Sequence, residues 1–102
     1  MVAYRFHPEA LLEYAEAANY YAREASPPVA QAFVSRVESA IRNVRESPTR
    51  WRIVEEPGVR RYPLRRFPYV VYYRFDAEHK RVTVYAVMHC SREPGYWKPR
   101  VA

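Results

Sequence analysis

The chain has 102 residues and a formal net charge of +6, and the whole excess lies in its second half. Residues 1–50 contain six Arg and six Glu, whereas residues 51–102 contain nine Arg and two Lys against four Glu and one Asp. This length supports a single domain over residues 1–102, and the single cysteine, Cys90, excludes an intrachain disulfide and fits a reducing cytoplasm. The apolar runs are far shorter than the ~20 residues of a membrane span, so we expect a cytoplasmic protein with a basic working surface.

The first half is predicted to hold a short strand and two helices. The strand covers residues 2–6, and Pro8 suits the first turn of a helix from Glu9 to about Arg23. Its expected buried face follows helical spacing: Leu11, Tyr14, Ala15, Ala18 and Ala22. The acidic residues, including Glu13, then lie away from that face. Ser26 and Pro27 begin a second helix that ends near Glu46, and the short linker requires an antiparallel hairpin.

The second half is predicted to hold three strands and an irregular tail. Residues 59–64 read as an edge strand, because Pro63 cannot donate to a ladder on both sides. Residues 69–75 and 81–88 are rich in β-forming residues and are joined by a polar turn. The order of elements predicts an α+β, βααβββ two-layer fold, in which a helical hairpin packs on one face of an antiparallel sheet.

A cluster of arginines beside aromatic residues is the first candidate site. Arg60, Arg61, Arg65 and Arg66 precede Phe67, Tyr69, Tyr72 and Tyr73. Guanidinium contacts to phosphate combined with aromatic stacking would suit single-stranded RNA. A solvated strand edge, whose charges prevent aggregation, explains the same arginines equally well.

The tail supplies the second candidate site. His89 is a candidate general base, Arg92 a candidate phosphate ligand, and Tyr96 a candidate proton donor or stacking partner. The alternative roles are structural: His89 as a polar residue at a sheet end, and Trp97 as a lid over the core. No metal or cofactor is expected, because the three histidines lack ligand spacing and the chain has one aspartate. A nuclease built from these residues would be metal-free and would act on RNA through the ribose 2′-hydroxyl.

In their order and spacing, these residues resemble the RelE/ParE superfamily of toxins from bacterial toxin–antitoxin modules. The most distinctive parts are Arg66-Phe67-Pro68-Tyr69 with Tyr73, and the tail from His89 to Trp97. Positions such as Glu13 and Arg61 also match. The resemblance implies the βααβββ fold, a cytosolic toxin, and a cognate acidic antitoxin that wraps a flexible segment around it in a hetero-oligomeric complex.

The superfamily divides by target. In a RelE-like, ribosome-dependent mRNA interferase, the resemblance implies catalytic roles for Arg61, Arg92 and Tyr96, with His89 as a compensating base. Two further basic positions of that branch fall at Val70 and Pro63 in this chain. A ParE-like toxin instead inhibits DNA gyrase without cutting nucleic acid, and we favour this interpretation. A non-toxic module kept for antitoxin binding is a third alternative.

In either branch, basic and aromatic residues are expected to contact the target or the antitoxin. These are Arg60, Arg65, Arg66, Tyr69, Tyr73, Trp97 and Arg100.

Overall fold

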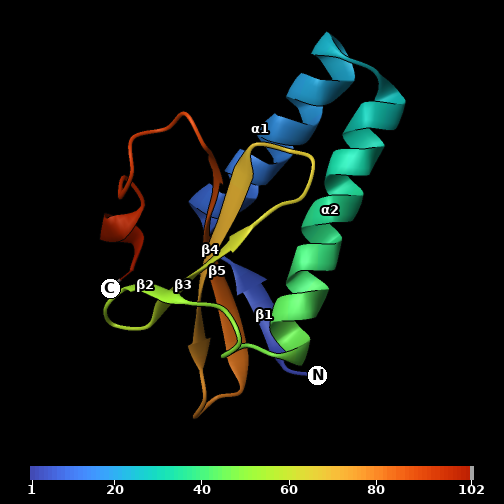
Figure 1. Cartoon of the computed structure of the whole chain (residues 1–102). Coiled ribbons are helices and arrows are strands. Elements are labelled where there is room, and N and C mark those ends of the chain that lie inside the picture. Colours follow the sequence, from blue (N-terminus) through green and yellow to red (C-terminus); the bar gives the residue numbers. More distant parts are fainter. Residues whose placement is uncertain (102) are drawn as a thin grey trace.

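The computed structural model describes residues 1–101, in which two helices pack on one face of a five-stranded sheet. The elements are β1 (Ala3–Phe6), α1 (Pro8–Glu24), α2 (Pro27–Glu46), β2 (Ile53–Glu55), β3 (Val59–Pro63), β4 (Tyr69–Asp76), β5 (Arg81–His89) and a 3-10 turn, η1 (Lys98–Arg100). Figure 1 shows α1 and α2 side by side, with the C-terminal tail on the opposite side of the strands. The α+β class and the order of the main elements are confirmed, and β2 is an additional strand.

The two helices begin at the capping signals of the sequence. The backbone N–H of Glu9 donates to His7 Nδ1 over 3.1 Å, and that of Val29 donates to Ser26 Oγ over 3.2 Å. A proline occupies the first turn of each helix, where its missing N–H costs no hydrogen bond. The predicted helical hairpin is therefore confirmed. In the part of the chain that the structure describes, neither helix is long and apolar enough to cross a membrane.

The buried face of α1 is rotated from the predicted one. Ala10 and Ala17 are buried, whereas the predicted Leu11, Ala15 and Ala22 are exposed. An alanine-rich helix has little contrast between its faces, so several stripes fit the same composition and packing selects among them. The rotation turns Glu13, which was expected on the outside, toward the sheet.

The sheet has the strand order β1-β5-β4-β3-β2 and is mixed. β1 runs parallel to β5, while the other pairs are antiparallel, so the prediction of a fully antiparallel sheet is wrong at this edge. The long connection that a parallel pair needs consists here of the helical hairpin followed by β2, β3 and β4. β3 is also not an edge strand, because β2 pairs with its first residues. Pro63 ends β3 beyond that pairing and disrupts no ladder.

A β-bulge in β5 changes which face its last residues occupy. Tyr72 pairs with Ala86 while the next residue, Tyr73, pairs with Val84, so Tyr85 is the extra residue. Val84 and Val87 both belong to the helix-side core. Without the bulge, residues three apart would lie on opposite faces. The bulge therefore sends His89 to the helix side of the sheet.

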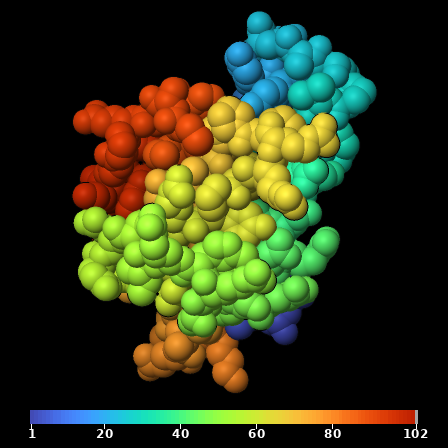
Figure 2. Space-filling model, viewed as in Figure 1, coloured from blue at the N-terminus to red at the C-terminus, as the bar shows by residue number. Residues whose placement is uncertain are grey.

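The second face of the sheet is partly covered by the tail. Trp97 stacks on Tyr72 with a ring-centroid distance of 4.7 Å, in a cluster that includes Val59, Val70 and Met88. In Figure 2 the tail (orange to red) lies on the side of the molecule opposite α2 (cyan to green). The apolar residues of β4 and β5 are therefore buried on both faces of the sheet.

Candidate functional site

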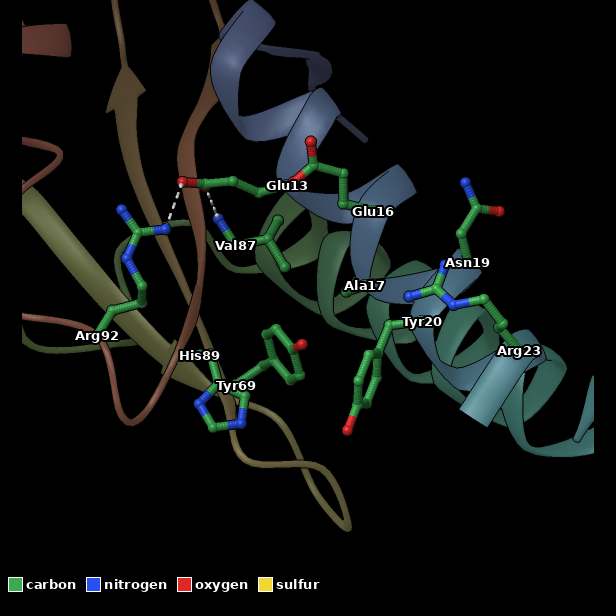
Figure 3. A pocket seen from close by; sticks show the side chains of 10 residues that line it. All are labelled: Glu13, Glu16, Ala17, Asn19, Tyr20, Arg23, Tyr69, Val87, His89 and Arg92. Atoms are coloured by element: carbon green, nitrogen blue, oxygen red, sulfur yellow. Dashed lines mark hydrogen bonds and ion pairs between the residues drawn. The ribbon is translucent and has the colours of Figure 1, made fainter. Parts of the chain in front are cut away.

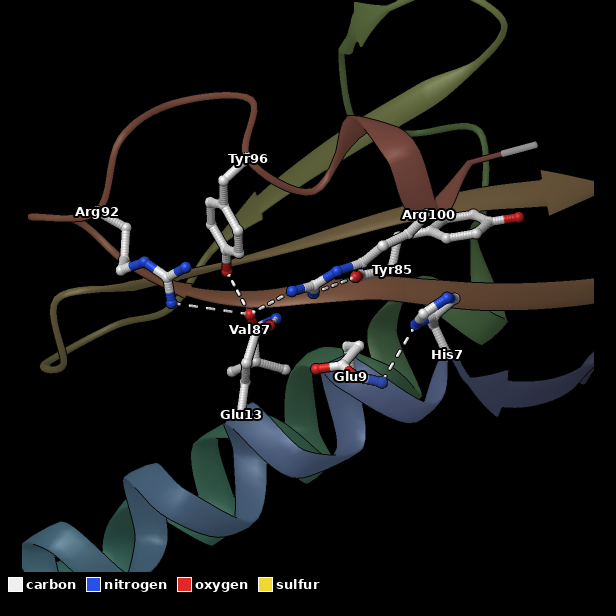
Figure 4. A network of polar contacts seen from close by, with 8 residues as sticks. All are labelled: His7, Glu9, Glu13, Tyr85, Val87, Arg92, Tyr96 and Arg100. Atoms are coloured by element: carbon white, nitrogen blue, oxygen red, sulfur yellow. Dashed lines mark hydrogen bonds and ion pairs between the residues drawn. The ribbon is translucent and has the colours of Figure 1, made fainter.

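A carboxylate on α1, that of Glu13, joins the helix to the edge of the sheet and to the tail (Figure 4). Its Oε1 accepts a hydrogen bond from the Val87 backbone N–H at 3.0 Å. Its Oε2 accepts from the Tyr96 hydroxyl at 2.6 Å and from Arg100 Nη2 at 2.9 Å. The side chains of Glu13 and Arg100 are only 13% and 14% exposed, so this is a mostly buried ion pair.

The geometry of β1 explains why these side chains gather here. β1 pairs with β5 only as far as Val84 and then turns into α1. The next outward-facing backbone groups of β5 have no strand beside them and need other partners. Glu13 accepts from Val87 N–H, and Arg100 Nη1 donates to the Tyr85 carbonyl over 2.9 Å. Two side chains therefore close the edge that β1 leaves open.

Tyr96 lies between two guanidinium groups and Glu13. The guanidinium carbon of Arg92 lies 3.8 Å from the centroid of the Tyr96 ring, and that of Arg100 lies 5.0 Å away. Burial and the hydrogen bond to Glu13 raise the pKa of Tyr96 well above its usual value. At neutral pH the hydroxyl therefore keeps its proton and donates a hydrogen bond to Glu13, an arrangement that suits a structural tie.

An open groove of about 490 Å³ lies between α1 and the adjoining ends of β4 and β5 (Figure 3). Its lining combines apolar, basic and acidic side chains: Glu13, Glu16, Ala17, Asn19, Tyr20, Arg23, Tyr69, Val87, His89 and Arg92. The side chain of Tyr20 is 51% exposed. Tyr69 is buried, and this burial raises the pKa of its hydroxyl to about 12. A groove with aromatic walls and arginines at its margin suits an extended peptide that carries apolar and acidic side chains.

His89 forms part of the wall of this groove. Its ring meets that of Tyr69 edge-on at a centroid distance of 5.0 Å. Its Nδ1 accepts a hydrogen bond from the Ser91 backbone N–H at 3.0 Å. In a neutral imidazole the other nitrogen, Nε2, then carries the proton. The nitrogen that would act as a general base is therefore already occupied.

The four residues proposed for RNA cleavage are not brought together. Arg92 and Tyr96 are in contact, but His89 and Arg61 lie on opposite faces of the sheet. Arg61 pairs with Tyr72, which belongs to the tail-side cluster, whereas His89 pairs with Tyr69 of the helix-side core. The bulge at Tyr85 causes this separation.

The predicted contact residues divide into exposed and buried groups. Arg65 and Arg66 are exposed in the turn between β3 and β4. Arg60 is half-buried and donates to the Thr49 and Trp51 carbonyls at 3.1 and 2.6 Å. Tyr69, Tyr73 and Trp97 are buried, and Arg100 is held by Glu13. A partner reaches Tyr73 or Trp97 only by displacing other parts of the chain, so contact with these two residues stays a prediction that requires such a displacement.

Sequence reasoning missed the contribution of α1 to this site. Glu13, Tyr20 and Arg23 line the groove, and none was proposed as a site residue. Periodicity gave no signal for them, because it placed Glu13 on the wrong side of the helix. The match of Glu13 to the superfamily pattern was the only available indication.

One group of possible metal ligands lies in the turn between β4 and β5. In residues 1–101, Asp76, Glu78 and His79 each place one ligand atom within 4.8 Å of the others. The group is exposed or half-exposed, and His79 Nδ1 already contacts Asp76 Oδ2 at 2.6 Å. This contact accounts for the arrangement of the two side chains.

Comparisons with known proteins agree with this architecture. A family model described as ParE toxin of type II toxin-antitoxin system, parDE, matches residues 4–94. No curated protein matches the sequence.

Two solved structures share the fold of this chain at low sequence identity. A chain of the chromosomal ParDE toxin–antitoxin system from P. aeruginosa is 19% identical, with a TM-score of 0.74, over 87% of this chain and 96% of the other. A chain of the RelBE2 toxin–antitoxin complex from Mycobacterium tuberculosis is 24% identical, with a TM-score of 0.60, over 86% of this chain and 96% of the other.

Proposed function

The chain belongs to the ParE toxin family of type II toxin–antitoxin systems, and we propose that it inhibits DNA gyrase and is neutralised by an acidic antitoxin. The observation that carries this choice of target is the separation of Arg61 from His89 by the sheet. RNA cleavage would need its acid, base and phosphate ligands around one scissile bond. An inhibitor that acts by binding needs no such assembly.

The groove beside α1 is the proposed docking site for the antitoxin. Tyr20 offers exposed apolar surface, and Arg23 and Arg92 lie at the margin of the groove. The exposed Arg65 and Arg66 directly precede Phe67, and Tyr69 follows two residues later; the rings of Phe67 and Tyr69 pack on Phe33 of α2. An antitoxin segment with alternating apolar and acidic residues could therefore pack its apolar side chains on the aromatic surface and pair its carboxylates with the arginines. The product would be a hetero-oligomeric complex.

Supercoiling by purified gyrase tests the proposed target. Addition of the chain in excess over gyrase should reduce the supercoiling of relaxed plasmid, and premixing with antitoxin should restore it. Unchanged supercoiling would contradict the proposal. A parallel primer-extension assay on translated mRNA tests the alternative: new 5′ ends that disappear in His89→Ala or Arg92→Ala would establish the RelE-like activity instead. If both assays are negative while antitoxin still binds, the chain is a non-toxic binding module.

The antitoxin site is tested by replacing Tyr20, whose side chain forms an open wall of the groove. Tyr20→Ala should weaken antitoxin binding by about tenfold or more, because exposed aromatic residues in a groove often act as anchors. Titration calorimetry with the product of the neighbouring reading frame gives the affinity. The matched control is Tyr4→Ala, an exposed tyrosine on β1 that does not line the groove. Equal losses in the two variants would place the antitoxin elsewhere.

A further inference from the structure

Three arginines gather on the part of the sheet that the tail leaves uncovered. Arg5 of β1 and Arg74 of β4 both pair with Thr83 of β5, and Arg81 lies two residues before Thr83. The neighbouring residues Val82, Val84 and Phe75 belong to the helix-side core. Because strand residues alternate, the arginines and Thr83 project from the opposite face.

These residues line a second cavity of about 340 Å³, distinct from the groove beside α1. Its lining consists of Arg5, Arg74, Phe75, Asp76, Ala77, Arg81, Thr83 and Tyr85. Arg5 Nε donates to Thr83 Oγ1 over 3.2 Å, and Thr83 is itself 8% exposed. The Arg5 guanidinium is thus tied to a buried hydroxyl in the centre of the sheet.

The positive charge of this cavity is not matched by carboxylates among residues 1–101. Asp76 is the only carboxylate in the lining, and His79 occupies both of its oxygens, with its backbone N–H at 3.2 Å and Nδ1 at 2.6 Å. Within residues 1–101, no carboxylate oxygen lies within 4.0 Å of the guanidinium nitrogens of the three arginines. Arg81 Nε is buried and meets no hydrogen-bond acceptor among the described residues. Any hydrogen-bond acceptor would satisfy this donor, and an anion would in addition neutralise the guanidinium charge.

We propose that this cavity binds a phosphate group, presented by a free nucleotide or by a nucleic-acid backbone. Three guanidinium forks and a threonine hydroxyl supply more donors than the two oxygens of a carboxylate can use, whereas phosphate carries more oxygens and up to two charges. Tyr85 adds aromatic surface beside the arginines, as a base would require. The site lies near the β4–β5 hairpin, which projects (orange) well away from the tail in Figure 2. The proposal therefore goes beyond gyrase inhibition and does not depend on it.

Binding is tested on the full chain with two phosphate probes and one acidic peptide. The probes are ATP and a single-stranded DNA of about 20 nucleotides, each fluorescently labelled, and the peptide is polyglutamate, all at about 150 mM NaCl. Arg74→Gln and Arg81→Gln should each weaken binding of at least one phosphate probe by about tenfold. A loss for ATP alone assigns a nucleotide site, and a loss for DNA assigns a backbone site. The matched control is Arg42→Gln, which removes the same charge from an exposed position of α2 and should change affinity less than about twofold.

Chemical-shift mapping on the unmodified chain keeps the test independent of folding of the variants. Addition of ATP or the DNA should shift amide signals of Arg5, Arg74 and the start of β5. Absence of saturable binding, equal losses in Arg42→Gln, or shifts elsewhere would overturn the proposal. Polyglutamate binding that is as tight as that of the phosphate probes, and as sensitive to Arg81→Gln, would also overturn it and assign the site to an acidic protein.

Discussion

Replacing Glu13 by alanine should lower the free energy of unfolding by about 3–5 kcal/mol, the usual cost of breaking a buried ion pair. The variant leaves the Arg100 guanidinium buried without its charge partner. It also removes the acceptor of the Tyr96 hydroxyl and of the Val87 backbone N–H. Three groups on two segments lose their partner at once. The tail should therefore detach from the edge of β5 before the rest of the domain unfolds.

Urea unfolding and limited trypsin digestion measure the two parts of this prediction. In Glu13→Ala, cleavage after Arg92 and Arg100 should become much faster than in the original chain. Glu13→Gln keeps an oxygen for one donor but removes the charge, so it should give an intermediate loss. Glu16→Ala, at an exposed position on the same helix, should change stability by less than about 0.5 kcal/mol. If Glu13→Ala behaves like Glu16→Ala, the network does not hold the tail.

The fold was predictable where local sequence signals mark the ends of helices and strands. Pro8 and Ser26-Pro27 determine where the helices start, and the polar turn of residues 76–80 separates two strands rich in β-branched and aromatic residues. The parallel pairing of β1 with β5 was not predictable, because it joins residues 78 positions apart, such as Arg5 and Thr83, and has no local signature. β2 was missed because three residues carry too little pattern.

The sequence predicted some of the residues that meet at the site, but not the face of the sheet on which each of them lies. The tail residues Arg92 and Tyr96 do meet, as their clustering in the sequence suggested. The position of His89 depends on a single bulge residue, Tyr85, inside a strand that otherwise alternates regularly. Strict alternation would have placed His89 on the same face as Arg61, where the RelE-like interpretation needs it. One inserted residue therefore decides which face of the sheet carries His89.

Phe33 has a second large expected effect, because it is the centre of the aromatic cluster that joins helices and sheet. Its ring is fully buried and lies 5.0–5.3 Å from the rings of Tyr21, Phe67 and Tyr69. Phe33→Ala should cost about 3–5 kcal/mol, since the truncation leaves a cavity that three rigid rings cannot easily fill. Chemical denaturation gives this value directly. Phe33→Leu should lose less, and Val29→Ala, on an exposed position of α2, should lose almost nothing.

Phe33→Ala also tests whether the buried aromatic cluster supports the groove. Tyr69 contacts Phe33 and also lines the groove. It pairs with His89 on the neighbouring strand β5. Loss of the Phe33 ring should therefore loosen Tyr69 and weaken antitoxin binding, although Phe33 itself is fully buried. Bound antitoxin should in turn recover part of the lost stability, because a ligand that binds only the folded state shifts the unfolding equilibrium. A Phe33→Ala variant that stays within about 1.5 kcal/mol of the original chain, with unchanged antitoxin affinity, would show that the cluster does not support the groove.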